Sequence, residues 1–298
     1  EAQETEPQKV DFNVSYDKEL AKNFVNEIAS VINKEPIDGQ ISITNGGGEI
    51  SVTPSQDGAT LNNEDLLNKI DAAVMDLNSE GQANVAADVA INRPRATTEA
   101  LNSVNTMIGT YQITMDAGAS GYNVTVGAPY VDDVLVMPGE VFSTTGSLGD
   151  TTPEKGYMAS NTYGEGGAIV QGYGGGLCEL ATALYDAALT AGIKPLERTE
   201  HMHPVHYGLP GLDATIGDYS PDFKFQNPYE YPVVVNTYTG GGVVTVEIWS
   251  NSDAKKGMTF VPRSEGNWSY AEGYLDTYDA NGNLVNSEFL NSSSYAPF

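Results

Sequence analysis

The chain has 298 residues, a length that suits one large domain or two ordinary ones. Its 14 Lys and Arg residues against 40 Asp and Glu residues give a formal net charge of −26, so nucleic acids and anionic membranes would repel it and are excluded as charge-bound partners. Hydrophobic residues make up 40% of the chain, which is typical of a folded protein, yet no apolar run reaches the roughly 20 residues of a membrane span. The single cysteine, Cys178, excludes an internal disulfide.

The first third of the sequence predicts a flexible lead-in followed by a small α+β unit over 11–92. Residues 1–10 are acidic and show no periodicity. Because the sequence begins with Glu1 rather than Met, we expect a signal or anchor segment to precede it in the full-length protein. Helical apolar spacing, alternation beside Asn-Gly and capping residues predict a helix at 16–33, a hairpin at 41–53, a helix after Asn62 or Asn63 and a strand at 85–91.

The rest of the sequence predicts a connector, a larger mixed α+β body and a β extension. Apolar alternation and turn glycines place the connector at 93–107, the body at 108–250 and the extension at 251–298. They predict a strand at 110–115, a hairpin at 231–249 and one strand pair around 280–283 in the extension. The polar stretch 143–176 is too long for a passive loop, so we expect it to be functional or partly folded. An Ala/Leu-rich run at 177–191 predicts a largely buried helix. The predicted fold class is α+β, in two modules.

Chemistry is expected around Cys178, which follows Gly174-Gly175-Gly176 and opens the predicted helix. Glycines allow positive φ and close approach of a ligand to the backbone. A thiol in the first helical turn experiences the positive end of the helix dipole, which favours the reactive thiolate, and the free N–H groups there can hold an oxyanion. The alternative is a buried, inert cysteine on an apolar helix, since free cysteine is among the most buried residue types.

All three histidines of the chain, His201, His203 and His206, lie within six residues. One of them is a candidate base for the Cys178 thiol. A metal site is the second interpretation, with the remaining ligand from His206 or a nearby aspartate, and surface histidines without a role are the third. Pro204 disfavours the regular strand on which a His-x-His metal pair would share one face, so we predict no metal and no other cofactor.

Three further charged residues near the histidines have open roles. Asp213 is either the third member of a triad, orienting a histidine, or a turn residue beside glycine. Arg198 and Lys194 are notable because cations are scarce in this chain. They either balance a helix C-terminus and nearby acids or hold a substrate carboxylate.

Several blocks then make the sequence recognisable, and they occur in a fixed order: PGEVFS at 138–143, GGGLCELATALYDAAL at 174–189, ER at 197–198, the stretch 201–207, PGLDATI at 210–216 and DFKFQN at 222–227. Over about 108–250 the chain resembles the VanW family, named for a protein encoded beside vancomycin-resistance genes. The unit at 11–92 is similar to a peptidoglycan-binding domain that often precedes VanW or L,D-transpeptidase domains.

The resemblance implies a bacterial envelope enzyme, extracellular in the cell wall or on the outer face of the membrane. It implies a peptidoglycan L,D-transpeptidase that forms 3–3 cross-links through a cysteine acyl-enzyme, or a carboxypeptidase if water is the acceptor. The family positions fall on Cys178 as nucleophile, His201 as base and Asp213 as orienting residue. The substrate-binding residues expected here are Arg198, Gly174, Gly175, Gly176, His203 and Tyr207.

This chain departs from the family pattern at several of these positions. Glu179 and Ala181 stand where Gln and Ser are usual, and His203 and His206 stand where Tyr and Ser are more common. A carboxylate at Glu179 would raise the pKa of the neighbouring thiol and oppose the helix dipole.

Two other functions stay open from the sequence: a non-catalytic wall-binding protein with an inert Cys178, and a metal-dependent peptidoglycan peptidase or amidase. In each case the expected partner is peptidoglycan, through its stem peptides, and a monomer is the default oligomeric state.

Overall fold

The computed structural model describes residues 15–76, 82–163, 169–218 and 220–297. The predicted lead-in, 1–10, therefore lies outside the described residues. The chain divides into two compact units, one of Glu1–Gly39 with Pro54–Thr97 and one of Gln40–Thr53 with Thr98–Phe298. The hairpin that the sequence groups with 11–92 thus belongs to the larger unit in the structure.

The smaller unit contains two helices beside a two-stranded antiparallel sheet. Its elements are α1 (Lys18–Ile32), α2 (Asn63–Met75), β3 (Gly58–Leu61) and β4 (Val89–Asn92). Both helices begin at a side-chain cap, because Asp17 accepts from the N–H groups of Glu19 and Leu20, and Asn62 accepts from that of Asp65. Their apolar stripes pack into a small core of Val25, Ala29, Leu61 and Leu66. The predicted helices are present, whereas the expected strand at 85–91 begins only at Val89.

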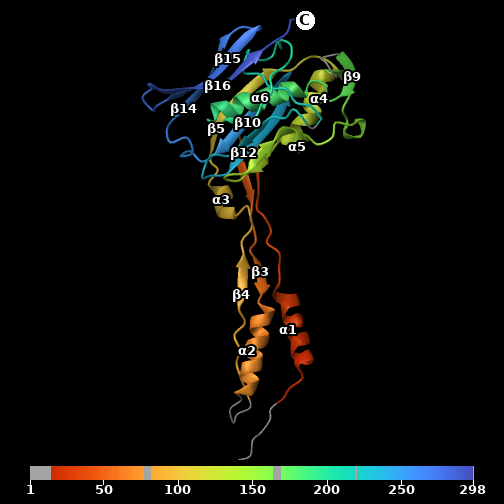
Figure 1. The fold of residues 1–298 in the computed structure, drawn as a ribbon, viewed down its shortest axis with the longest axis vertical. Coiled ribbons are helices and arrows are strands. Elements are labelled where there is room, and N and C mark those ends of the chain that lie inside the picture. Colours follow the sequence, from red (N-terminus) through yellow and green to blue (C-terminus); the bar gives the residue numbers. More distant parts are fainter. Residues whose placement is uncertain (1–14, 77–81, 164–168, 219, 298) are drawn as a thin grey trace, which may run out of the picture. The chain divides into compact units, whose positions relative to one another are not determined.

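A four-stranded antiparallel sheet in the order β5-β13-β12-β6 is the centre of the larger unit (Figure 1). Its strands are β5 (Thr106–Thr114), β6 (Val134–Val136), β12 (Val233–Gly240) and β13 (Val243–Ser250). The predicted strand and hairpin correspond to β5 and to β12–β13, whose Val-rich sequences suit burial on both faces.

Helix α6 (Leu177–Thr190) lies against this sheet and forms the main core with it (Figure 1). Nearly every residue of the helix is buried, as its Ala/Leu-rich sequence predicts. The contact with β5 is so close that a Cβ added at Gly109 would lie 2.6 Å from Ala187 O and from Ala191 N. This close packing fixes the height of α6, and so of its first turn, over the sheet.

Smaller elements surround this core. They are the hairpins β1 (Gln40–Ile43)–β2 (Ile50–Thr53) and β8 (Ala159–Tyr163)–β9 (Ile169–Tyr173), the sheet β10 (Pro195–Glu197)-β11 (Lys224–Gln226)-β7 (Val141–Ser143), and the sheet β14 (Thr259–Gly266)-β15 (Tyr270–Tyr278)-β16 (Leu284–Ser294). The helical ones are α3 (Thr98–Asn102), α4 (Ala119–Gly127), η1 (Ala128–Val131), α5 (Thr144–Leu148) and η2 (Pro153–Lys155).

Several of these elements refine the sequence predictions. The stretch 143–176 is partly folded, into α5, η2 and the hairpin β8–β9. The expected connector contains α3, and the C-terminal extension has three strands rather than one pair. Helix α4 was not expected, because its sequence, ASGYNVTVG, combines glycines and β-branched residues without an apolar stripe.

The close contact of α6 with β5 gives a stability prediction. Gly109→Ala should lower the free energy of unfolding by about 1–3 kcal/mol, because the added methyl group pushes the helix off the sheet. Gly240→Ala is the matched control, since a Cβ there meets nothing within 4 Å, and its effect should stay within about 0.5 kcal/mol. Urea denaturation of both variants measures this, and equal midpoints would show that the helix can move at no cost.

Candidate active site

Cys178 is the second residue of α6, in the first turn, and its side chain is half-buried. The N–H of Leu177 donates to Gly174 O and that of Glu179 donates to Gly176 O. No described residue accepts a hydrogen bond from the N–H of Cys178 itself. This free donor next to the thiol, at the positive end of the helix dipole, can stabilise an oxyanion.

The three glycines before Cys178 are required by backbone geometry and crowding. Gly174 and Gly176 have φ of 82° and 103°, a region that L side chains rarely adopt. A Cβ at Gly176 would lie 2.4 Å from Ser120 O, and one at Gly175 would lie 2.4 Å from Asn161 O. The glycines therefore let α4 and β8 approach the start of α6; their expected contact with substrate stays a prediction.

The thiol of Cys178 lies against the segment that follows Asp213. Its Sγ is 3.4 Å from Thr215 Oγ1 and accepts from the N–H of Ile216 at 3.5 Å. Thr182, one turn further along α6, holds this segment through two hydrogen bonds of 3.1 Å between its Oγ1 and the N–H and C=O of Ala214. Helix α6 thus supplies both the thiol and the anchor for its polar neighbours.

His201 and Asp213 form a buried hydrogen-bonded pair beside the thiol. The Nδ1 of His201 is 2.7 Å from Asp213 Oδ2, and the backbone N–H of His201 donates to the same oxygen at 2.8 Å. The imidazole and the Cys178 thiol also influence each other's pKa. The structure therefore brings together the three residues that the sequence nominates as nucleophile, base and orienting acid.

The pKa shifts of Cys178 and His201 favour an ion pair between the two side chains. Burial raises the pKa of the Cys178 thiol, but the hydrogen bond and charge of His201, with Thr215 and the Ile216 N–H, outweigh it and lower the pKa overall. Burial lowers the pKa of His201, but Asp213 and Cys178 raise it to about 9. Both shifts favour a thiolate and an imidazolium, the reactive form of a cysteine nucleophile.

Arg198 and Tyr295 also donate hydrogen bonds to Asp213. Arg198 donates to Asp213 through Nε to the backbone O at 2.6 Å and through Nη2 to Oδ1 at 3.0 Å. The Tyr295 hydroxyl also donates to Oδ1. Although burial raises the pKa of Asp213, these donors and His201 hold it below its usual value, so the carboxylate stays charged.

The structure places Arg198 inside the protein. Its side chain is 4% exposed, and its Nη1 donates to Asn291 and Ser293 of β16. Its expected role with a substrate carboxylate is not tested by these contacts, which all lie within the chain.

The other two histidines have partners of their own. The Nδ1 of His203 is 3.0 Å from Ala296 O, and Nε2 of His206 is 2.7 Å from Asp116 Oδ1. In the described part of the chain, no group of three or more His, Cys, Asp or Glu side chains has a geometry suited to a metal ion. Tyr207, in contrast, joins the site, because its hydroxyl is 3.0 Å from His201 Nε2.

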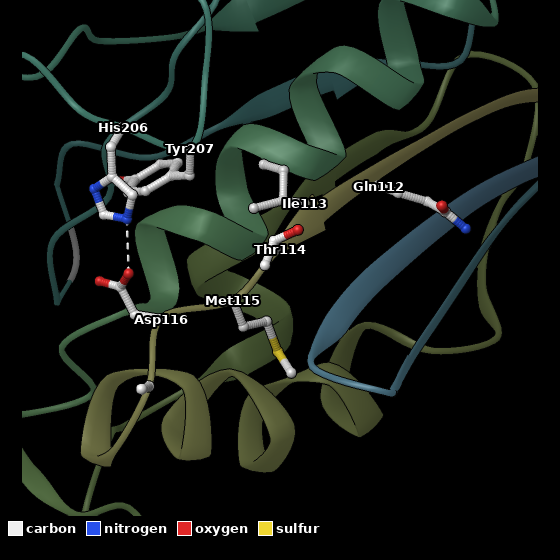
Figure 2. A pocket seen from close by; sticks show the side chains of 8 residues that line it. Gln112, Ile113, Thr114, Met115, Asp116, His206 and Tyr207 are labelled. Carbon is white, nitrogen blue, oxygen red and sulfur yellow. Dashed lines mark hydrogen bonds and ion pairs between the residues drawn. The ribbon is translucent and has the colours of Figure 1, made fainter.

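A cavity of about 420 Å³ adjoins the site and shares Tyr207 with it. The end of β5 and the residues that follow it, 112–117, form one wall, and His206 and Tyr207 form the other. Figure 2 shows His206 facing Asp116 at one side of the cavity and Gln112 at the far side. Asp116 could not be predicted from the sequence, because nothing in its local pattern distinguishes it from other turn aspartates.

The comparisons with known proteins agree with these features. Residues 119–249 match the family model described as "VanW like protein". The chain contains a VanW domain. Residues 2–81 match a second family model, described as "Putative peptidoglycan binding domain", so a peptidoglycan-binding domain precedes the VanW domain.

A relative in Bacillus subtilis (strain 168), "Uncharacterized protein YoaR", is 26% identical over 251 residues, which cover 83% of this chain and 80% of the relative. No solved structure matches the chain significantly. Together the two domains indicate a cell-wall-related function, a cell-wall-associated location and peptidoglycan as a binding partner. Of the helices described, none has the length and apolar character needed to cross a bilayer.

The ion pair at the VanW domain's cysteine gives a pH prediction. The rate of iodoacetamide alkylation of native protein should rise with pH around a midpoint below about 8.5, the value of an ordinary thiol. His201→Ala should move the midpoint upward, because only burial and two neutral donors then act on the thiol. Above a pH of about 9 wild-type His201 itself loses its proton, so the two rates should converge.

His203→Ala is the control for this measurement, because His203 bonds to Ala296 O and does not contact the thiol. Its alkylation midpoint should equal that of the wild type. Equal midpoints for wild type and His201→Ala would show that the imidazole does not share a proton with Cys178.

Proposed function

We propose that the VanW domain is a cysteine L,D-transpeptidase that acts on the stem peptides of peptidoglycan. The observation that carries this proposal is the position of Cys178 at the start of α6, next to the hydrogen-bonded pair of His201 and Asp213, whose imidazole lowers the pKa of the thiol. Its geometry suits acyl transfer, in which a nucleophile, a proton carrier and an orienting acid act together. The peptidoglycan-binding domain supports the choice of substrate.

In the first half of the proposed reaction the enzyme is acylated. The Cys178 thiolate attacks the carbonyl carbon of the third residue of a donor stem, and the resulting oxyanion is held by the free N–H of Cys178. His201 gives its proton to the nitrogen of the departing D-alanine as the C–N bond breaks. A thioester on Cys178 and a neutral His201 remain.

In the second half an acceptor resolves the thioester. The side-chain amine of the third residue of another stem attacks the thioester carbon, and the C–S bond breaks to release the Cys178 thiolate. His201 takes a proton from the attacking nitrogen, and a 3–3 cross-link forms. Water in place of the amine would give a carboxypeptidase product.

Arg198 and Tyr207 have supporting roles in this scheme. Arg198 acts through Asp213, because it fixes the carboxylate that orients His201. Tyr207 stays a neutral phenol, since burial raises its pKa well above the usual value, and it can donate to Nε2 of neutral His201. The proposal keeps Gly174, Gly175, Gly176 and His203 as candidate substrate contacts.

The central test is the acyl-enzyme itself. Wild-type protein incubated with a disaccharide-tetrapeptide should gain the mass of the donor minus D-alanine in intact-mass spectrometry. Cys178→Ala should show no adduct and no cross-linked product, while its free energy of unfolding changes by about 1 kcal/mol or less, because the lost Sγ leaves only a small cavity.

The same measurement separates the alternatives. A wild-type protein that binds peptidoglycan but never forms the adduct would be a non-catalytic wall-binding protein. Cleavage that survives in Cys178→Ala and stops on chelation would indicate a metal-dependent peptidase.

A further inference from the structure

The cavity beside the VanW domain's triad has a wall made from the free edge of a strand. Strand β5 is at the edge of its sheet, next to β13 only. The N–H of Met115, directly after β5, donates to Gly242 O at 2.8 Å. Because backbone hydrogen bonds alternate in direction along an antiparallel strand, the backbone groups of the odd-numbered residues of β5 point toward β13. The backbone groups of Gln112 and Thr114 therefore point away from β13, and both residues are exposed in the cavity wall.

Further along the same edge, the Thr190 side chain of α6 bonds to the backbone of Thr110, where a neighbouring strand would otherwise pair. The N–H of Thr110 donates to Thr190 Oγ1 at 3.0 Å, and this hydroxyl is 3.3 Å from Thr110 O. The open part of the edge is thus limited to Gln112 and Thr114, directly before Asp116. An extended peptide can pair with such an edge, as in strand addition.

A buried carboxylate lies behind the cavity wall, where it bonds to the backbone of one of the lining residues. Glu179, the residue after Cys178, is 1% exposed, and its Oε2 accepts from the N–H of Asp116 at 3.0 Å. No described residue donates to its other oxygen, Oε1. The carboxylate interacts electrostatically with Asp116 and His206, which both line the cavity. Burial, the largest influence, raises the pKa of Glu179 to about 7, so it can gain or lose a proton near neutral pH.

An amine acceptor that arrives charged has to lose two protons, to protein groups or to solvent. A lysine-type side-chain amine arrives as an ammonium ion, with three protons on nitrogen. The amide nitrogen that it becomes carries one, so two protons must leave. His201 can take one of them, and the Cys178–His201–Asp213 chain offers no acceptor for the other.

We propose that this cavity binds the acceptor stem and that Glu179 removes the first proton from its ammonium group. This inference rests on the proposed transpeptidase function and deepens it. The ammonium group lies between the carboxylates of Asp116 and Glu179, where opposite charge favours it, and the acceptor backbone pairs with Gln112 and Thr114.

The proton balance closes with these groups. Glu179 takes one proton and leaves a neutral amine, whose lone pair attacks the thioester carbon. His201 takes the second proton as the C–N bond forms and the C–S bond breaks, which restores the thiolate and imidazolium. Glu179 then releases its proton to water through the open cavity. The arrangement favours an amine acceptor over water, because a water molecule has no positive charge for the two carboxylates to attract.

The test compares Glu179→Gln with wild type at pH 7, using a disaccharide-tetrapeptide as both donor and acceptor. The variant should form the acyl-enzyme at a rate within about threefold of wild type, because Glu179 is not among the groups that shift the pKa of the Cys178 thiol and the proposed acylation needs no proton from it. The ratio of cross-linked dimer to hydrolysed tripeptide should fall by about tenfold or more, the effect of losing one general base. Glu197→Gln, which removes the same charge from β10, is the matched control and should leave the ratio unchanged.

Hydroxylamine, a nucleophile that is neutral at pH 7, separates proton removal from a structural effect. It should release the acyl group from wild type and from Glu179→Gln at similar rates, because it arrives without an extra proton. Equal loss of both reactions in the variant, or an unchanged dimer-to-tripeptide ratio, would overturn the role of Glu179. A wild-type protein that never forms an acyl-enzyme would instead overturn the transpeptidase function on which the inference rests.

Discussion

The buried carboxylate of Asp213 is the group on which the architecture of the site depends. A buried charge without partners is costly by several kcal/mol, and it is retained in proteins only where donors surround it. Here the donors come from segments far apart in the sequence, through His201, Arg198 and Tyr295. By satisfying one carboxylate, the fold fixes the imidazole that faces Cys178 and ties the C-terminal sheet to the centre of the domain.

The features that the sequence could predict are those with a local cause. The apolar stripes and side-chain caps predict α1 and α2, and alternation about Asn45-Gly46 predicts the hairpin β1–β2. The predicted helix at 177–191 matches α6 closely, because an uncharged Ala/Leu run has few other stable states in a folded protein. Helix α4 was not predicted, since its conformation depends on packing against α6 rather than on its own sequence.

The site divides in the same way. Cys178, His201 and Asp213 could be predicted as site residues because their side chains can act in catalysis and their sequence neighbours are distinctive. The family resemblance then assigned a role to each. Tyr295 could not, because its only connection to the site is through space, across the C-terminal sheet. The environment of Glu179 could not be predicted either. Its contact with Asp116 joins positions 63 residues apart, and the residue type alone does not show that the Glu179 side chain is buried.

The contribution of β16 and Tyr295 to Asp213 has a consequence during biosynthesis. Chains fold as they emerge, beginning at the N-terminus, and residues 291–295 follow every other part of the site. A nascent chain that has already formed α6 still lacks Asn291 and Ser293 beside Arg198 and the hydroxyl of Tyr295 beside Asp213. Until these last groups arrive, Asp213 keeps His201 and Arg198 as partners but lacks the Tyr295 hydroxyl, and Arg198 lacks its partners on β16. The site therefore reaches its full set of hydrogen bonds only after β16 and Tyr295 have joined the domain.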